Sequence, residues 1–297
     1  HVLGRLESFF PILFNCEGVY AQNMKTLVSD IELARPTFLV AVPRVLEKIY
    51  ERAMAKIEEN ELKKLLFSYA ENIANDYFET IEQDKTPDSK LIIEYQLAKK
   101  FVFNKIYNMF GGKIRYIISG GAPLSPKISQ FLRNANLTVL EGYGLTETIA
   151  PCCINPMNKQ VLGTVGKPMG DVEIKFAKDN EILIRSKALF SGYYKNQKET
   201  DKALDEDGWF ASGDIGFFDN QGFLNISDRK KDIIITSGGK NIAPQKLENM
   251  LKLRPYISQA VVVGNKRKYL TALIGVEFES FLEKLEQLQI SPTIPLK

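Results

Sequence analysis

The segment from 141 to 148 combines side chains that rarely occur together by chance, and it reads Glu141-Gly142-Tyr143-Gly144-Leu145-Thr146-Glu147-Thr148. The two glycines permit a tight turn and a close approach of the backbone to a ligand. Tyr143 offers a flat face to a base, and Thr146 offers a hydroxyl to a phosphate oxygen. Glu147 offers a carboxylate oxygen, the kind of ligand that Mg²⁺ prefers. The combination favours nucleoside triphosphate chemistry; the alternative is a glycine-rich turn with a helix-capping threonine.

Short apolar runs predict the strands that lead up to this segment. A β-branched run at 37–42 predicts a buried strand, 114–118 predicts a second, and 137–140 predicts the strand that delivers the signature segment. Pro43 is suited to the first turn of a helix, and 125–132 predicts another helix.

Helical stretches flank these strands. Residues 1–14 are apolar with few breaks and predict a helix that runs into a strand, and 25–32 predicts a helix that ends before Pro36. Residues 58–110 predict mostly helix, broken at Pro87, with apolar stripes on one face and lysines and glutamates on the others. These stripes indicate packing rather than chemistry.

The chain changes character after position 160. Polar and apolar residues alternate at 172–176 and 181–185, as in half-buried antiparallel strands, so residues 161–228 predict a small β subdomain. Beyond it we expect a strand, a helix, a hairpin and a last helix, at 233–236, 244–253, 260–276 and 281–288.

Composition limits the class of protein. The 297 residues are 44% hydrophobic and 25% charged, which fits a soluble globular protein of two or more domains. A net charge of +3 is too small to argue for a nucleic-acid partner, while a peripheral membrane contact and the oligomeric state are left open. The three cysteines form neither a disulfide framework nor a metal site, and one histidine cannot supply a metal cluster. No apolar run has the length of a membrane span and no signal peptide is found, so we expect a cytoplasmic location, or one peripheral to the inner face of a membrane.

The segment 141–148 resembles the central signature of the adenylate-forming enzymes, the family of acyl-CoA synthetases, nonribosomal adenylation domains and firefly luciferase. Members of this family activate a carboxylate with ATP to an acyl-adenylate and then transfer the acyl group. Further segments resemble the other motifs of the family and fall in the family's order, namely Gly120–Pro123, Gly163–Pro168, Asp214 and Arg229–Gly239. The resemblance covers nearly the whole chain.

The resemblance implies a nucleotide site. The adenine-contacting loop would be Gly120, Gly121, Ala122 and Pro123, and the other nucleotide contacts would be Glu141, Gly142, Tyr143, Gly144, Thr146, Asp214 and Arg229. Tyr143 would stack on the adenine, and Asp214 would accept hydrogen bonds from the ribose hydroxyls, which are stronger when the acceptor is charged. Thr146, Glu147 and Arg229 would take part in catalysis, with Glu147 holding Mg²⁺.

The resemblance also implies a hinge and a passage for CoA. Lys231 would be the hinge about which the C-terminal domain turns, and Gly238, Gly239 and Lys240 would line the passage for the pantetheine arm. The cations at 266–268 suit the 3′-phosphate of CoA, or form an exposed turn. His1, followed by Val-Leu-Gly, resembles half of a motif whose histidine lies near the reacting carboxylate.

The implied fold is the α/β fold of the adenylate-forming synthetases, with a parallel-sheet α/β region, a small β-barrel-like subdomain and a partial α+β C-terminal domain. We expect residues 1–160 to form the second half of the α/β core, with a helical insertion at about 55–110. Residues 161–228 would form the β subdomain, and 229–297 the hinge and part of the C-terminal domain.

The long connection between Pro43 and Gly120 resembles the long-chain class of acyl-CoA synthetases. The implied reaction is the ATP- and Mg²⁺-dependent activation of a long-chain fatty acid and its transfer to CoA, giving acyl-CoA, AMP and pyrophosphate. Two alternatives stay open: a carrier protein as the acyl acceptor, and a nucleotide-binding remnant without catalysis.

Two motifs of the family do not occur in the chain. The loop that wraps the β- and γ-phosphates has no counterpart, and the end of the chain at 291–297 does not supply the C-terminal catalytic lysine. The chain also starts without a methionine. We therefore expect the middle and hinge region of a larger synthetase, and no acyl-adenylate formation by the 297 residues alone.

Overall fold

The computed structural model describes residues 2–254 and 256–287. It divides into two compact units, which are described separately. The first consists of His1–Lys175, Leu183–Phe210 and Phe218–Asn225, and the second of Phe176–Ile182, Ala211–Phe217 and Ile226–Lys297. The three-part division expected from the sequence stays a prediction.

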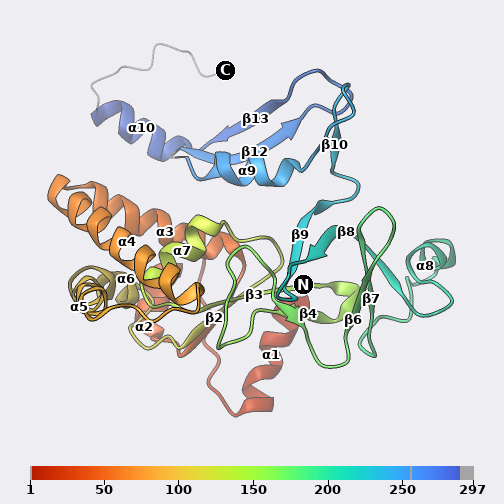
Figure 1. Cartoon of the computed structure of the whole chain (residues 1–297), viewed down its shortest axis with the longest axis horizontal. Helices are drawn as coiled ribbons and strands as arrows, with labels where there is room; N and C mark the ends of the chain where they lie inside the picture. The colour runs from red at the N-terminus through yellow and green to blue at the C-terminus, as the bar shows by residue number, and fades with distance from the viewer. Residues whose placement is uncertain (1, 255, 288–297) are drawn as a thin grey trace. The chain divides into compact units, whose positions relative to one another are not determined.

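The first unit contains a five-stranded sheet with the strand order β1-β2-β3-β4-β5, of which Figure 1 labels β2, β3 and β4. The strands are β1 (Phe38–Ala41), β2 (Tyr116–Ser119), β3 (Val139–Leu145), β4 (Ala150–Ile154) and β5 (Lys167–Pro168). β1, β2 and β3 are parallel, whereas β4 and β5 join antiparallel. Because β2 and β3 are parallel neighbours, the segment that follows β2 lies beside the second half of β3. The predicted α/β core is confirmed.

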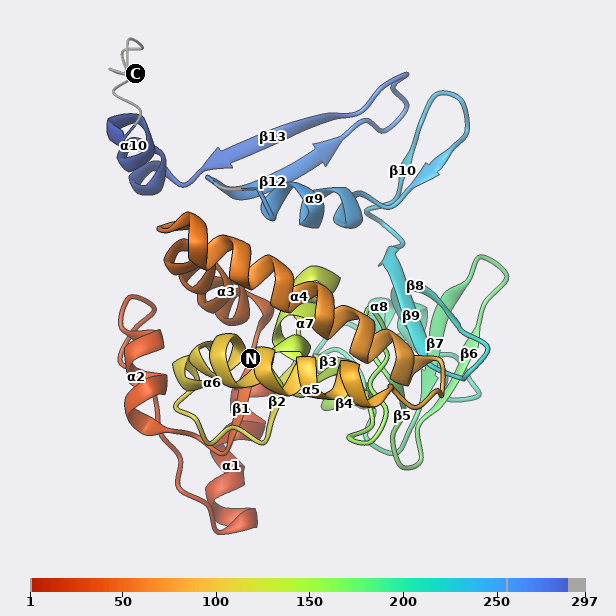
Figure 2. The ribbon, with the colours of Figure 1, turned by 60° about the vertical axis from the view of Figure 1, so that its left-hand side comes forward.

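Helices surround this sheet, and Figure 2 shows α4, α5 and α6 lying along it. The helices of this unit are α1 (Val2–Phe14), α2 (Leu27–Ala34), α3 (Pro43–Glu58), α4 (Glu61–Glu82), α5 (Ser89–Ala98), α6 (Asn104–Met109), α7 (Pro126–Asn134) and α8 (Gln197–Ala203). Side-chain caps explain two of the starts, since Asn60 accepts hydrogen bonds from the first turn of α4 and Asp88 from that of α5. The predicted break at Pro87 lies between these two helices.

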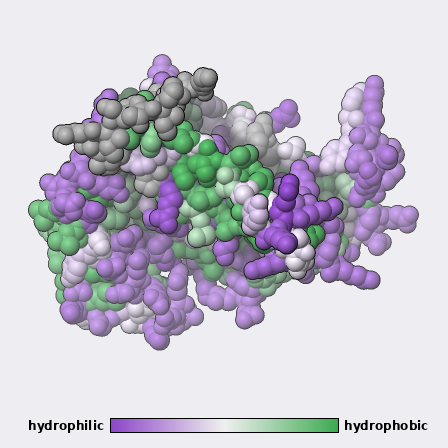
Figure 3. Space-filling model, turned by 90° about the horizontal axis from the view of Figure 1, so that it is seen from above, coloured by the Kyte–Doolittle hydropathy of each residue, from purple (hydrophilic) through white to green (hydrophobic). Residues whose placement is uncertain are grey.

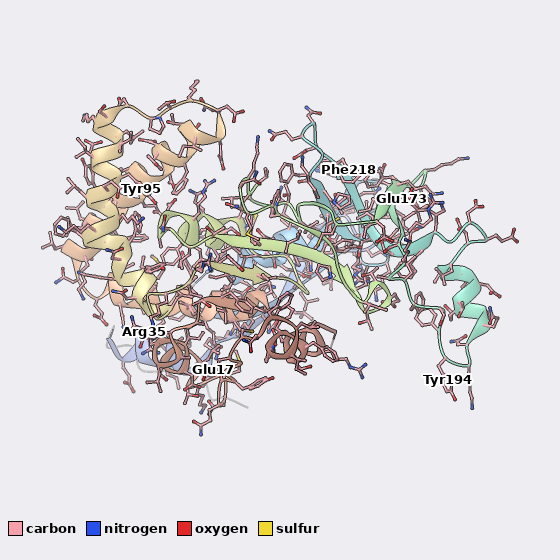
Figure 4. The ribbon with its side chains drawn as sticks, turned by 90° about the horizontal axis from the view of Figure 1, so that it is seen from below. Glu17, Arg35, Tyr95, Glu173, Tyr194 and Phe218 are labelled. Atoms are coloured by element: carbon pink, nitrogen blue, oxygen red, sulfur yellow. The ribbon has the colours of Figure 1, made fainter. Side chains whose placement is uncertain are left out.

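Aromatic packing fixes α7, the helix that follows the glycine loop. Phe131 of α7 meets the ring of Tyr50 of α3 edge-on, with centroids 4.9 Å apart. Nearby, Tyr95 of α5 stacks on Tyr77 of α4 at 4.2 Å, within the helical layer seen in Figure 4. Edge-to-face and offset-stacked pairs of this kind stabilise a core beyond the area that they bury.

Three elements differ from the sequence-based expectation. The predicted strand at the end of 1–14 does not form, because α1 continues to Phe14 with Pro11 inside it. A π-helical turn, η1 (Lys99–Phe103), joins α5 to α6, and the short helix α8 was not predicted. α8 begins where Asn196 caps it, in a segment without an apolar stripe.

A second sheet has the order β6-β7-β8-β9, with strands drawn from both units. Its strands are β6 (Glu173–Phe176), β7 (Glu181–Arg185), β8 (Phe210–Phe218) and β9 (Leu224–Arg229). The second unit then continues with β10 (Ile234–Ile235), β11 (Asn241–Ile242), α9 (Pro244–Lys252), β12 (Ile257–Val263), β13 (Thr271–Val276) and α10 (Phe278–Gln287). The predicted hairpin is confirmed as the antiparallel pair β12–β13, on which α9 packs.

The surface is mostly hydrophilic in the view of Figure 3, with hydrophobic side chains gathered in a few places. Among the described residues, none of the helices combines the length and the apolar character needed to cross a bilayer.

Candidate active site

The signature segment is an extended strand and not the tight turn expected from its glycines. β3 continues through Leu145, and neither Gly142 nor Gly144 has a positive φ. Gly142 is needed for a close approach instead, because a Cβ atom there would lie 3.2 Å from the carbonyl oxygen of Cys153 on β4. The pairing with β4 shifts register between Tyr143 and Gly144.

The predicted adenine loop lies beside this strand. It follows β2 directly, and the N–H of Gly120 donates to the carbonyl oxygen of Ala41 at 3.4 Å. Gly121 has φ +84°, a conformation that glycine adopts without strain. A Cβ atom on Gly120 would lie only 3.3 Å from the carbonyl oxygen of Gly142, so the loop and the signature strand touch. Ala122 and Pro123 are exposed at this edge.

Two signature side chains face inward. Tyr143 is 8% exposed, and the thiol of Cys152 donates to its carbonyl oxygen at 3.3 Å. Glu141 is 7% exposed and accepts a hydrogen bond from the hydroxyl of Ser129 at 3.1 Å. The ring of Tyr143, which is expected to stack on the adenine, is therefore packed into the first unit and does not project into solvent.

Thr146 and Glu147 lie at the end of the strand, in the 3₁₀ turn η2 (Thr146–Thr148). Thr146 is exposed. The threonine cap of the alternative interpretation is also present, at Thr148, whose hydroxyl oxygen accepts from the N–H of Leu145 at 2.8 Å. Tyr193 donates its hydroxyl to Glu147 Oε1 at 2.9 Å, and the N–H of Phe190 donates to the Glu147 carbonyl oxygen at 2.8 Å. The carboxylate is thus held in one orientation.

Burial and the Glu147 carboxylate together raise the pKa of Tyr193 to about 12. The phenol therefore stays protonated, and remains a donor, throughout the physiological pH range. This tyrosine was not assigned a role from the sequence.

The residues present fit a magnesium ion that arrives with a nucleotide. Within the described part of the chain, no cluster of three or more histidine, cysteine, aspartate or glutamate side chains could hold a metal. Mg²⁺ is commonly held by one or two carboxylates together with substrate phosphates, and a single oriented carboxylate such as Glu147 suits that arrangement.

The second unit brings together the two residues expected at the ribose. Arg229 Nε lies 2.9 Å from Asp214 Oδ1, and the Asp214 side chain is 5% exposed, against 47% for Arg229. The N–H of Asp214 donates to the hydroxyl oxygen of Ser212 at 3.1 Å. A buried carboxylate with an exposed guanidinium beside it can accept from sugar hydroxyls on one side and attract a phosphate on the other.

The hinge motif is anchored by two residues that precede Lys231, namely Asp228 and Lys230. Lys230 Nζ lies 2.6 Å from Asp179 Oδ2 and 2.7 Å from Glu181 Oε2. The buried Asp228 accepts from the N–H of Gln245 at 3.2 Å, which joins β9 to the start of α9. Lys231 itself is exposed in the turn after β9. The anchoring roles of Lys230 and Asp228 were not foreseen, because ion partners distant in sequence leave no local pattern.

The glycine loop expected to line the CoA passage is the turn between β10 and β11. Gly239 has φ +77°, and the N–H of Thr236 donates to the carbonyl oxygen of Lys240 at 3.0 Å. The turn before β13 docks against this loop, since the N–H of Ser237 donates to the carbonyl oxygen of Arg267 at 2.9 Å. Gly238, Gly239 and Lys240 are exposed.

The structure therefore assembles part of the predicted site in each unit. The adenine loop, Tyr143, Thr146 and Glu147 belong to the first unit, and Asp214, Arg229 and Lys231 to the second. A single pocket made by all of them stays a prediction. His1 lies outside the described residues.

Comparison with sequence-family models gives two matches. The model described as AMP-binding enzyme matches residues 1–194, and the model described as AMP-binding enzyme C-terminal domain matches residues 231–294. A long-chain-fatty-acid–CoA ligase, FadD15 of Mycobacterium bovis, is 40% identical over 95% of this chain and 46% of its own length. Long chain acyl-CoA synthetase 7 of Arabidopsis thaliana, a peroxisomal protein, is 34% identical over 88% of this chain and 38% of its own. The chain thus spans about half the length of the curated relatives it matches, or less.

Solved structures share the fold. The o-succinylbenzoate CoA synthetase of Bacillus subtilis, in complex with its acyl-adenylate intermediate, superposes with a TM-score of 0.64 at 22% identity, over 100% of this chain and 54% of that one. The adenylation domain of a carboxylate reductase from Mycobacterium chelonae gives 0.64 at 23% identity, over 94% of this chain and 45% of that one. The adenylate-forming fold expected from the sequence is confirmed, and the chain belongs to the AMP-binding enzyme family.

Proposed function

We propose that this chain supplies the nucleotide site and the hinge of an enzyme that activates a long-chain fatty acid with ATP and transfers the acyl group to CoA, releasing AMP and pyrophosphate. The observation that carries the proposal is the contact between the Gly120–Pro123 loop and the signature strand at the carboxyl edge of the parallel sheet. Ligands of open α/β sheets bind at that edge. The names of the relatives support the fatty acid and CoA.

The first half-reaction brings two anions together, a carboxylate and the α-phosphate of ATP. The protein must neutralise charge as the new bond forms. Thr146 would donate its hydroxyl to a phosphate oxygen, and Glu147, oriented by Tyr193, would hold Mg²⁺, which supplies charge neutralisation at the phosphates when bound. Asp214 and Arg229 would fix the ribose and its phosphate, so that the α-phosphate has one position.

In the second half-reaction, the thiol of CoA must reach the carbonyl carbon of the activated acyl group. The Gly238–Lys240 turn would line the path of the pantetheine arm after a rotation about Lys231, which is a hinge type of change. The side chains of Lys266, Arg267 and Lys268 lie on the turn that contacts this loop, and they form no ion pair among the described residues. They would therefore be available to bind the phosphates of CoA.

One experiment distinguishes the proposed CoA ligase from the two alternatives, which are a carrier protein as the acyl acceptor and a nucleotide-binding remnant without catalysis. The chain is joined to the part of the Mycobacterium bovis relative that lies outside the match, and pyrophosphate exchange and thioester formation are measured with ATP, Mg²⁺, palmitate and CoA. We expect exchange and palmitoyl-CoA from the fusion, both lost in Glu147→Gln, and neither from the 297-residue chain alone.

Exchange without palmitoyl-CoA would favour a carrier protein as the acceptor. Nucleotide binding without exchange would favour the non-catalytic remnant and contradict the proposal. Robust exchange by the chain alone would refute the expectation that it needs a larger synthetase.

A further inference from the structure

Helix α9 begins without a capping side chain of its own. Its N-cap residue is Ala243, which has no polar side chain, and Pro244 at the first helical position has no N–H to donate. The first backbone donor of the helix is therefore the N–H of Gln245, which donates to Asp228 Oδ2 at 3.2 Å. The acceptor that α9 lacks locally is thus supplied from 17 positions earlier in the chain.

Asp228 is suited to this contact. A carboxylate at the N-terminus of a helix is favoured by the helix dipole, and hydrogen bonds to an ionised acceptor are stronger than those to a neutral one. Asp228 is 2% exposed, and its other oxygen, Oδ1, accepts from the N–H of Arg229 at 2.7 Å. Separation from Gln245 would therefore leave one oxygen of a buried carboxylate without its donor, which is unfavourable.

The two partners of this hydrogen bond lie on opposite sides of the predicted hinge residue. Asp228 belongs to β9 and precedes Lys231, whereas α9 follows it. The segment before Lys231 is fixed to the neighbouring strand, because the N–H of Lys230 donates to the carbonyl oxygen of Gly213 on β8 at 2.8 Å. All of these residues belong to the second unit.

The elements after Lys231 form one body, made of α9 and the hairpin β12–β13. Helix α9 packs on β12, beside which it lies in Figure 2. Glu248 of α9 accepts from the N–H of Val262 on β12 at 2.8 Å. A contact that holds the start of α9 therefore holds the hairpin as well, and the Asp228–Gln245 hydrogen bond joins this body to β9 across the hinge.

We propose that Asp228 is a positioning residue, which latches the body of α9 and β12–β13 in a single orientation to β9 and must release Gln245 when that body turns about Lys231. A turn at Lys231 moves the groups after it relative to those before it, so a hydrogen bond across it cannot persist. The latch therefore favours one orientation over the other, and with it one half-reaction. The turn rests on the proposed function, whereas the hydrogen bond does not.

Hydrogen exchange at the amide of Gln245 in the 297-residue chain tests the contact. We expect Asp228→Ala to speed this exchange about tenfold, because the acceptor is lost. Asp228→Asn keeps an acceptor oxygen and the volume of the side chain, so a smaller increase is expected, which also serves if Asp228→Ala does not fold. Asp201→Ala removes an exposed carboxylate from α8 and is the control. Unchanged exchange in both variants of Asp228 would overturn the proposal.

Distances between two spin labels test whether the latch holds the body in one orientation. The labels are attached to Lys178→Cys, on the exposed turn between β6 and β7, and to Lys246→Cys, on the exposed side of α9. Cys16 is replaced by serine, because the other two cysteines are buried. We expect one narrow distance distribution without a change at Asp228 and a broader or bimodal one in Asp228→Ala. Identical distributions would contradict the latch.

The ratio of the two half-reactions separates a latch from a residue that only stabilises the fold. It is measured in the fusion with the Mycobacterium bovis relative, as pyrophosphate exchange and as transfer of palmitate from palmitoyl-adenylate to CoA. We expect Asp228→Ala to change this ratio about fivefold, because one orientation gains population at the expense of the other. Equal losses in both half-reactions would overturn the proposal. If Gln245 exchange and the label distances respond as expected but the unmodified fusion catalyses neither step, the latch stands and the proposed function fails.

Discussion

The signature strand of the first unit and the hinge of the second unit hold their functional residues by different physical means. The signature strand lies in the mixed five-stranded sheet, where close backbone contacts at Gly120 and Gly142 and the buried Glu141 set its position. The hinge depends on charge, through the Asp214–Arg229 pair and the contacts of Lys230 with two carboxylates. The nucleotide loop is thus fixed by burial and close packing, while the hinge is held by ion pairs, of which Lys230–Asp179 is exposed to solvent on both sides.

This difference suits the proposed two-step reaction. A site that recognises the nucleotide gains from a preorganised backbone, because no free energy is then needed to order it on binding. A hinge that must turn between half-reactions gains from contacts that exchange readily, and exposed ion pairs contribute little to stability.

The largest effect should come from filling the backbone contact at Gly166. This residue has φ +83°, and a Cβ atom would lie 2.0 Å from the carbonyl group of Ile154. We expect Gly166→Ala to cost more than about 4 kcal/mol of unfolding free energy, or to prevent folding. Gly208 has φ +79° with open space around it, so Gly208→Ala should cost only about 1–2 kcal/mol. Urea unfolding measures both; equal losses would contradict the role of close packing.

The next effect concerns the buried Glu141. Its pKa is raised from 4.5 to about 7 on folding, so the folded state loses stability as the pH rises between these values. In Glu141→Gln we expect this decline to disappear, with a gain of at most about 3 kcal/mol over the wild type above pH 7. Unfolding by urea across this pH range is the measurement. A wild type without the decline would show that Glu141 is not desolvated.

A smaller effect is expected at the Glu147 carboxylate. Tyr193→Phe removes the hydroxyl that orients it, and we expect Mg²⁺-ATP to bind about fivefold more weakly. The neighbouring Tyr194 is 88% exposed, so Tyr194→Phe is a matched control without effect. Calorimetric titration of both variants with ATP, in the presence and in the absence of Mg²⁺, shows whether the weakening depends on the ion. Equal weakening in the absence of the ion would argue against a metal-holding role for Glu147.

The smallest effect should come from Lys230→Ala. The ammonium group and its partner Asp179 are exposed, so water and salt screen their attraction, whereas the second partner, Glu181, is only 13% exposed. We expect a small loss of stability at low ionic strength, most of which vanishes at about 0.5 M salt. A loss that persists in salt would show that the hinge is held by packing, and would remove the contrast between the two regions.

Motifs with local spacing were predictable from the sequence, whereas contacts between distant segments were not. The glycine loop, the signature and the hairpin β12–β13 each show in a short window of residues. The tight turn expected at Gly142 and Gly144 does not form, because a glycine that allows a turn and one that allows close packing, as Gly142 does, look the same in sequence. Tyr193 lies 46 positions from Glu147, and Lys230 lies 49 from Glu181, so only the folded chain reveals these pairs.

A nucleotide site is tested most directly by calorimetric titration of the 297-residue chain with AMP, in the wild type and in Asp214→Ala. Asp201→Ala, on the short helix α8, is the matched control. Asp214 is expected to accept both ribose hydroxyls, so one AMP should bind per chain, with an affinity at least about tenfold lower in Asp214→Ala and unchanged in the control. Absence of binding by the wild type, or equal binding by Asp214→Ala, would contradict the nucleotide site.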